Sequence, residues 1–226
     1  MSKYTDYRKE SKMLGIDVSH WQGDIDFEAV KKAGYSFVIM KCGGSDRGFY
    51  RDSKFETYYR QAKEAGLYVG TYYFVGRKFR GTESGVADAK RMIELIRGKS
   101  FEMPVVVDVE NQQNPSVNRG KITDATIAFC KTLEENGYYA MIYGSDYSTF
   151  VESVDLERLT AYDKWVARYS TSKPKYVESY GIWQYGGDDN YLCRAKVSGV
   201  SSNACDQNFA YKDYPTIMRK NKLNGC

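Results

Sequence analysis

Short apolar runs alternate with longer amphipathic stretches along most of the chain. This alternation is typical of repeated strand–helix units, in which each strand is buried and each helix exposes one face. One run, residues 103–107, is apolar without alternation, as expected for a parallel strand that is covered on both faces. Strands are predicted at residues 13–18, 36–41, 67–75, 103–107, 139–143, 164–168, 181–185 and 204–207.

Helices are predicted between the first five strands, where apolar residues recur at helical spacing. Gly34, Gly66 and Gly137 each follow a predicted helix, as is usual at a helix C-terminus, and Asp26 is suited to cap the first helix. Five regular βα units followed by strands with few helices indicate a barrel whose last third is irregular. The predicted helices cover residues 27–33, 53–65, 82–97, 122–136 and 156–161.

The composition is that of one ordinary globular domain, with 226 residues of which 42% are hydrophobic. The net charge of +4 is spread along the chain, whereas nucleic-acid binding requires a concentrated basic face. No apolar run approaches the length of a membrane span. The polar segment 1–12 has no apolar core typical of a signal peptide, so we expect a flexible extension there and a single domain at 13–226.

The histidine and cysteine content argues against several chemistries. His20 is the only histidine, whereas zinc amidases and peptidases need two or more, so His20 is interpreted as a hydrogen-bonding or packing residue. The five cysteines include no Cys-x-x-Cys pair. Cys193 and Cys205 flank a polar loop and could pair, but free buried thiols are favoured. We therefore expect no metal site and no cofactor.

Acidic residues stand at the ends of three predicted strands: Asp17 on the first, Asp108 and Glu110 on the fourth, and Asp206 on the last. In a β/α barrel, the chemistry is carried at the C-terminal ends of the strands. Asp108 and Glu110 would point to one side of an extended strand, about 6.6–7 Å apart at Cα. Two such carboxyl groups push each other's pKa apart, so one can remain protonated while the other is ionised, as glycoside hydrolysis requires. Alternatively, Asp108 caps the next element and Glu110 is a solvated loop residue.

Seven segments resemble the family 25 glycoside hydrolases, the Chalaropsis-type lysozymes that include many phage endolysins. The opening segment and the D-x-E motif together are specific. The segments occur in the family order between about residues 13 and 211, as 15–23 (GIDVSHWQG), 37–41 (FVIMK), 70–74 (GTYYF), 108–110 (DVE), 165–169 (WVARY), 183–185 (WQY) and 206–208 (DQN).

The resemblance implies an α/β fold, a modified TIM-type barrel of about five βα units and three closing strands, with N-acetylmuramidase activity on the β-1,4 bond of peptidoglycan. The family's acidic quartet falls on Asp17, Asp108, Glu110 and Asp206, with Glu110 as the general acid. Asp108 would orient the substrate's N-acetyl group or stabilise the oxocarbenium-like state, and Asp17 and Asp206 would hold this pair. Strand-end residues that could line the sugar groove, or equally pack in the core, are Lys41, Tyr72, Tyr143, Trp165 and Gln184.

The chain departs from the family pattern at three places. Tyr73 stands at the usual strand-three histidine position, a change expected to alter a groove contact. Arg168 stands where an acidic or polar residue is common and is expected to place a positive charge near the cleft rim. The loop before Asp206 contains two cysteines and a basic insert.

Two alternatives to an active muramidase are a catalytically silent peptidoglycan-binding barrel and another hydrolase, for example one directed at chitin. The complete quartet favours the active enzyme. We expect a monomer that binds the glycan strand of peptidoglycan and neither nucleic acid nor a membrane. It would act on the bacterial cell wall, reaching it by release on lysis after cytoplasmic synthesis or as an excised domain.

Overall fold

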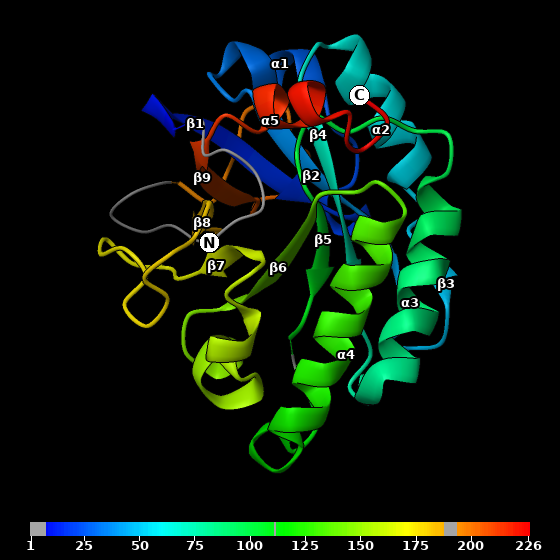
Figure 1. Ribbon diagram of the computed structural model, residues 1–226. Coiled ribbons are helices and arrows are strands. Elements are labelled where there is room, and N and C mark those ends of the chain that lie inside the picture. Colours follow the sequence, from blue (N-terminus) through cyan, green and yellow to red (C-terminus); the bar gives the residue numbers. More distant parts are fainter. Residues whose placement is uncertain (1–7, 111, 188–193) are drawn as a thin grey trace.

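A closed barrel of eight strands forms the centre of the computed structural model, which describes residues 8–110, 112–187 and 194–226 (Figure 1). Neighbouring strands run parallel from β1 round to β8, whereas β9 runs antiparallel between β8 and β1. The short strand β3 (Tyr50–Arg51) pairs only with the end of β2. The barrel strands are β1 (Arg8–Val18), β2 (Phe37–Gly44), β4 (Tyr68–Phe74), β5 (Val105–Asp108), β6 (Ala140–Ser145), β7 (Asp163–Ala167), β8 (Ile182–Gly186) and β9 (Asp206–Lys212).

The helices confirm the predicted arrangement, with regular helices first and irregular connections afterwards. α1 (Phe27–Lys32), α2 (Phe55–Glu64), α3 (Gly81–Ile96) and α4 (Pro115–Glu135) follow β1, β2, β4 and β5. The remaining described helices are η1 (His20–Gln22), η2 (Ser148–Ser153), η3 (Leu156–Leu159) and α5 (Tyr214–Asn221).

Two helix predictions need correction. α4 begins at Pro115 and not at residue 122, because proline is favoured in the first turn, where no backbone N–H is needed. α5 was not predicted. Its first turn is capped by the side chain of Asp213, which accepts a hydrogen bond from the backbone N–H of Thr216 at 3.3 Å.

The first strand is longer than the sequence pattern predicts. Residues 8–12 were expected in a flexible extension, but β1 begins at Arg8, which is the register partner of Lys212 on β9. Strand pairing uses backbone groups, so a polar segment can join a sheet wherever a neighbouring strand offers unpaired N–H and C=O groups. Residues 1–7 lie outside the described part of the chain.

The apolar core has two layers, set by the alternation of side chains along each strand. On β5, Val105 and Val107 pack with the outer helices, whereas Val106 faces the barrel interior. The interior layer continues into α5, where Ile217 and Met218 join the same cluster. Because the Tyr214 hydroxyl donates to Asp163 at the start of β7, α5 covers the end of the barrel at which the parallel strands begin.

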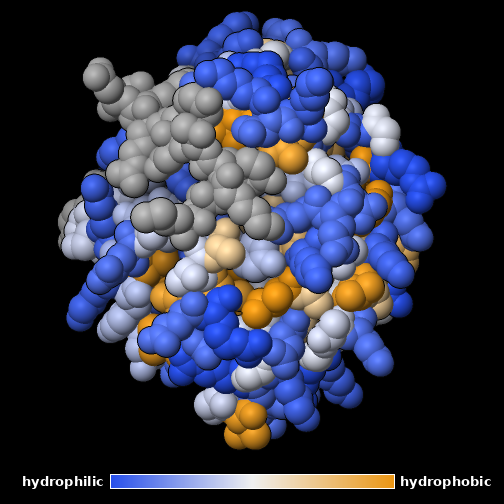
Figure 2. Space-filling model, in the orientation of Figure 1, coloured by the Kyte–Doolittle hydropathy of each residue, from blue (hydrophilic) through white to orange (hydrophobic). Residues whose placement is uncertain are grey.

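The outer surface seen in Figure 2 is mostly hydrophilic, with apolar side chains in scattered patches. None of the helices in the described ranges is both long and apolar enough to cross a membrane.

Helices α3 and α4 lie side by side and approach closely at Gly85 (Figure 1). A Cβ atom at Gly85 would overlap the backbone carbonyl group of Ala125 on α4. The close approach of the two helices therefore requires a glycine at this position. Gly120, an exposed glycine of α4, differs because a Cβ atom there would meet nothing within 4 Å.

These two glycines give a matched test of helix packing. We expect Gly85→Ala to lower the free energy of unfolding by about 1–3 kcal/mol, because the methyl group forces the helices apart. Gly120→Ala should raise it by about 0.5–1 kcal/mol, since alanine restricts the unfolded chain more than glycine does. Urea unfolding of both variants measures the difference, and equal effects would contradict the packing argument.

Candidate active site

The four acidic residues of the predicted quartet lie at one end of the barrel. Asp108 ends β5 and shares the inward face of that strand with Val106. Asp206 begins β9 and is the register partner of Asp17 near the end of β1. Because β9 runs antiparallel, its first residue lies at the end where the parallel strands finish. Glu110 follows two residues after Asp108.

Asp17 is held in one position by two amide side chains. Its Oδ2 accepts hydrogen bonds from Gln184 Nε2 at 2.9 Å and from Asn208 Nδ2 at 2.8 Å. The amide oxygens face other donors: the Tyr143 hydroxyl donates to Gln184 at 2.8 Å, and the Trp165 indole N–H donates to Asn208 at 2.7 Å. Each amide therefore has its NH₂ group directed at the carboxylate.

Burial and mutual repulsion raise the pKa of the carboxyl groups in this cluster. For Asp17, burial is the largest cause, the charge of Asp206 adds to it, and the hydrogen bonds from the two amides oppose it. The pKa of Asp108 is also well above its usual value, first through burial and then through Glu110, while the charge of Lys41 lowers it. The folded protein therefore favours the protonated form of these two groups.

Glu110 is half-buried and is not the solvated loop residue of the alternative interpretation. Burial raises its pKa, the charge of Asp206 raises it further, and a hydrogen bond with Tyr143 lowers it. Asp206 itself accepts a hydrogen bond from the Tyr169 hydroxyl at 2.6 Å. Asp108 Oδ1 differs from these groups, because it is buried and accepts no hydrogen bond from any described residue.

The five predicted lining residues all fall on inward-facing positions of their strands. Tyr143, Trp165 and Gln184 are buried, and Tyr72 is half-buried. The Trp165 ring lies 4.4 Å from that of Tyr143 and 6.2 Å from that of Tyr72, between ring centroids. With only 1% of Trp165 exposed, these aromatic side chains form a floor beneath the carboxyl groups.

Lys41 lies beside the floor on β2. Its Nζ is 4.5 Å from the ring centre of Phe74 and 5.4 Å from that of Tyr50, so aromatic faces stabilise the ammonium group. Burial lowers the pKa of Lys41, and the charge of Asp108 acts in the opposite direction. The charge of Lys41 thus partly offsets the rise in the pKa of Asp108.

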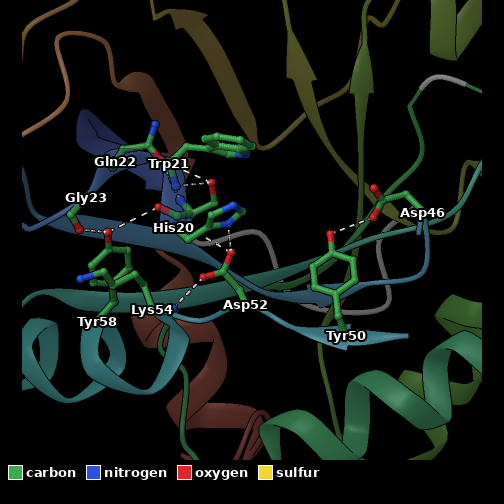
Figure 3. A network of polar contacts seen from close by, with 10 residues as sticks. His20, Trp21, Gln22, Gly23, Asp46, Tyr50, Asp52, Lys54 and Tyr58 are labelled. Atoms are coloured by element: carbon green, nitrogen blue, oxygen red, sulfur yellow. Dashed lines mark hydrogen bonds and ion pairs between the residues drawn. The ribbon is translucent and has the colours of Figure 1, made fainter. Parts of the chain in front are cut away.

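The segment after β1 leaves the barrel at the end where Asp17 lies, and Figure 3 shows its polar contacts. His20 Nδ1 lies 2.8 Å from Oδ2 of the buried Asp52, which confirms His20 as a hydrogen-bonding residue. Ser19 and Gln22 cap the short helix η1 reciprocally. This rigid turn leaves the indole of Trp21 74% exposed.

The departures from the family pattern lie mostly outside the groove. Tyr73 is buried in the outer core, so the expected change in a groove contact was wrong: neighbouring strand positions face opposite sides. Arg168 does not present a free charge, since its Nη1 donates to Asp146 at 2.9 Å. Cys205 is a buried free thiol, and Cys193 lies outside the described residues.

Two residues near the acidic cluster were not predicted as site residues. Asn208 contacts Asp17, and its position two residues after Asp206 on one strand could have indicated a shared face. Tyr169 contacts Asp206 but follows the end of β7, where no strand alternation applies. Tyr169 closes the segment 165–169 that resembles the family, but its spacing from β7 does not indicate the contact with Asp206.

Comparisons with known proteins agree on one family for this chain. The family model of glycosyl hydrolases family 25 matches residues 16–192. The chain is similar to the "Autolytic lysozyme" of Clostridium acetobutylicum, at 28% identity over 85% of this chain and 54% of that protein. It is also similar to "Lysozyme M1" of Streptomyces globisporus, at 29% identity over 85% of this chain and 66% of that protein. The chain thus spans about half of the first relative's length and just under two thirds of the second's.

Among solved structures, the CTP1L endolysin has the same fold, with a TM-score of 0.76 and 22% identity over 92% of this chain and 70% of that chain. The family match covers most of the sequence, and the matched segments supply the strand ends at which three of the four carboxyl groups meet. The chain belongs to family 25 of the glycosyl hydrolases.

Proposed function

We propose that this chain is an N-acetylmuramidase that hydrolyses the β-1,4 bonds of bacterial peptidoglycan. The observation that carries the proposal is the group of four carboxyl groups at one end of the barrel, in a chain of this family. The lysozyme names of two relatives support the same substrate. In this proposal the barrel from Arg8 onward is the catalytic domain, and it acts at the cell wall as a monomer without a cofactor.

Glu110 is proposed as the general acid. An acid must still carry its proton when the substrate arrives, and burial beside Asp206 raises the pKa of Glu110 in the required direction. Glu110 is half-buried, so its carboxyl group is both poorly hydrated and accessible. It would donate its proton to the glycosidic oxygen as the bond breaks.

Asp108 would act on the sugar itself, in one of two ways. It would orient the N-acetyl group for attack on the anomeric carbon, or its charge would stabilise the oxocarbenium-like state. The buried Oδ1 without a hydrogen-bond partner among the described residues supports the first way, because an acetamido N–H could satisfy it. Asp17 and Asp206 would position this pair through repulsion and hydrogen bonding.

The lining residues divide between two roles in this proposal. Lys41 and Tyr72, both half-buried, would contact the sugar directly. Tyr143, Trp165 and Gln184 would act mainly as positioning residues, because their polar atoms bond to side chains of the network around Asp17.

Replacing the proposed acid tests the reaction. We expect Glu110→Gln to lower the rate of cell-wall hydrolysis by about 10²–10⁴-fold, the usual contribution of a general acid. The measurement is the release of reducing ends from purified peptidoglycan, with identification of the new terminal sugar. Glu94→Gln, at an exposed position on α3, is the matched control and should leave the rate unchanged.

The products decide between this function and its alternatives. Muramic acid at the new reducing ends supports the muramidase. Glucosamine ends from peptidoglycan, or cleavage of chitin alone, would replace it with another hydrolase. Tight binding to cell walls without any product would instead indicate a catalytically silent binding protein.

The raised pKa of Asp108 also predicts a pH-dependent cost to stability. Between its usual value of 3.8 and the raised value, the folded state binds more protons than the unfolded state, so the free energy of unfolding decreases as pH rises. We expect Asp108→Asn to have a higher Tm than the wild type at neutral pH, with the difference vanishing near pH 3. Thermal unfolding followed by circular dichroism across this range measures it.

Asp24 serves as a control because its pKa is shifted in the opposite direction to that of Asp108. Its hydrogen bond with Lys54 lowers its pKa, so its contribution is favourable at neutral pH and is lost as pH falls. Asp24→Asn should therefore leave the neutral-pH Tm unchanged or lower it. A lower Tm for Asp108→Asn at neutral pH would argue against electrostatic strain at this position.

A further inference from the structure

A pocket of about 830 Å³ lies beside the acidic cluster and is not used by the proposed reaction. Its walls come from the segments that follow β2, β4 and β5, together with α3 as far as Arg91. These segments leave the barrel at the end where the carboxyl groups lie. The volume is within the range of pockets that bind small ligands.

The exposed charges of the pocket are mainly positive. Arg77, Lys78 and Arg91 line it and are exposed, and Arg77 and Lys78 form no ion pair with any described residue. Asp88 is buried and already accepts hydrogen bonds from Ser45 at 2.9 Å and from Arg91 at 3.3 Å. The pocket thus offers free cations to an anionic group.

One acidic group of the pocket remains exposed. Asp46 lies at the side facing β2, where the Tyr50 hydroxyl donates to it at 2.8 Å (Figure 3). The charge of Asp46 also reaches the cluster, since it raises the pKa of Asp108. A ligand with several carboxylates and one amino group would match this distribution of charge.

The pocket shares a wall with the proposed acid. Gln112 lines the pocket and is 8% exposed, and its Nε2 donates to the backbone oxygens of Glu110 at 3.1 Å and Gly76 at 3.2 Å. Its Oε1 is buried and has no hydrogen-bond partner among the described residues. Through Gln112, the pocket is therefore linked directly to the backbone of the proposed acid.

We propose that this pocket binds the peptide arm of the muramic acid unit at the cleaved bond, an inference that rests on the proposed function. In a muramidase substrate, the sugar whose anomeric carbon reacts also carries a lactyl group extended by a short peptide. That peptide bears free carboxylates, an amino group and backbone amides. Arg77 and Lys78 bind its carboxylates and Asp46 its amino group, so the enzyme prefers glycan strands that retain their peptides.

The test compares glycan strands carrying peptides with the same strands after the peptides are removed by an amidase. Wild-type protein should cleave the peptide-bearing strands with a kcat/KM higher by at least about tenfold, the effect of roughly one charge-assisted hydrogen bond. Arg77→Ala/Lys78→Ala should lose this preference through KM, with cleavage of the stripped strands unchanged. The control is Arg60→Ala/Lys131→Ala, which removes the same charge from exposed positions on α2 and α4.

Three results would overturn the inference: equal cleavage of both substrates by the wild type, an equal loss on both substrates in the Arg77/Lys78 variant, or the same loss in the control. If the wild type cleaves neither substrate, the proposed function fails. The pocket is then tested by the binding of the peptide alone. Calorimetric titration with the free peptide arm then measures the Kd. Binding that weakens at least about tenfold in the Arg77/Lys78 variant supports the pocket, and no binding by the wild type refutes it.

Discussion

The repulsion among four carboxyl groups in a poorly hydrated end of the barrel is the constraint on which the site depends. The ionised form of each group would be more stable in water than at this position. The pKa values of Asp17, Asp108 and Glu110 are raised for this reason. A site of this kind persists only if the surrounding structure is stable enough to hold it. The closed barrel and its two apolar layers provide that stability.

The network around Asp17 shows how the repulsion is managed. Two amides donate to one carboxylate, and a tyrosine and a tryptophan fix the amides from behind. These supporting groups carry no net charge, but the amide N–H donors stabilise the ionised form and oppose the rise in the pKa of Asp17. Only Lys41, among the causes of the shifts at Asp17, Asp108 and Glu110, supplies a positive charge, and its own pKa is lowered by burial. The raised pKa values favour the protonated forms, which is the direction that the proposed general acid needs.

The sequence alone predicts most of this arrangement, because strand ends in a parallel barrel converge. Apolar runs locate seven of the eight barrel strands, whereas the strand predicted at 204–207 overlaps β9 (Asp206–Lys212) only at Asp206 and Gln207. The inward position of Asp108 follows from its spacing to Val106. The same alternation argument, applied to Tyr73, would have placed it in the outer core. Tyr169, the pocket wall at Gln112 and the polar start of β1 were not predictable in this way. They depend on loop paths and backbone pairing, which leave no periodic pattern in the side chains.

The pairing of β9 with β1 has a consequence for the synthesis of the protein. Asn208 and Asp17 are separated by 191 residues, so their contact forms only after residue 208 has left the ribosome. Such distant pairing is also slow to form, because the ends of a long loop must meet first. A nascent chain that ends before β9 therefore lacks the opposed pair of Asp17 and Asp206. The four acidic residues are therefore brought together only once β9 has paired with β1, and no fragment that ends before β9 contains the complete cluster.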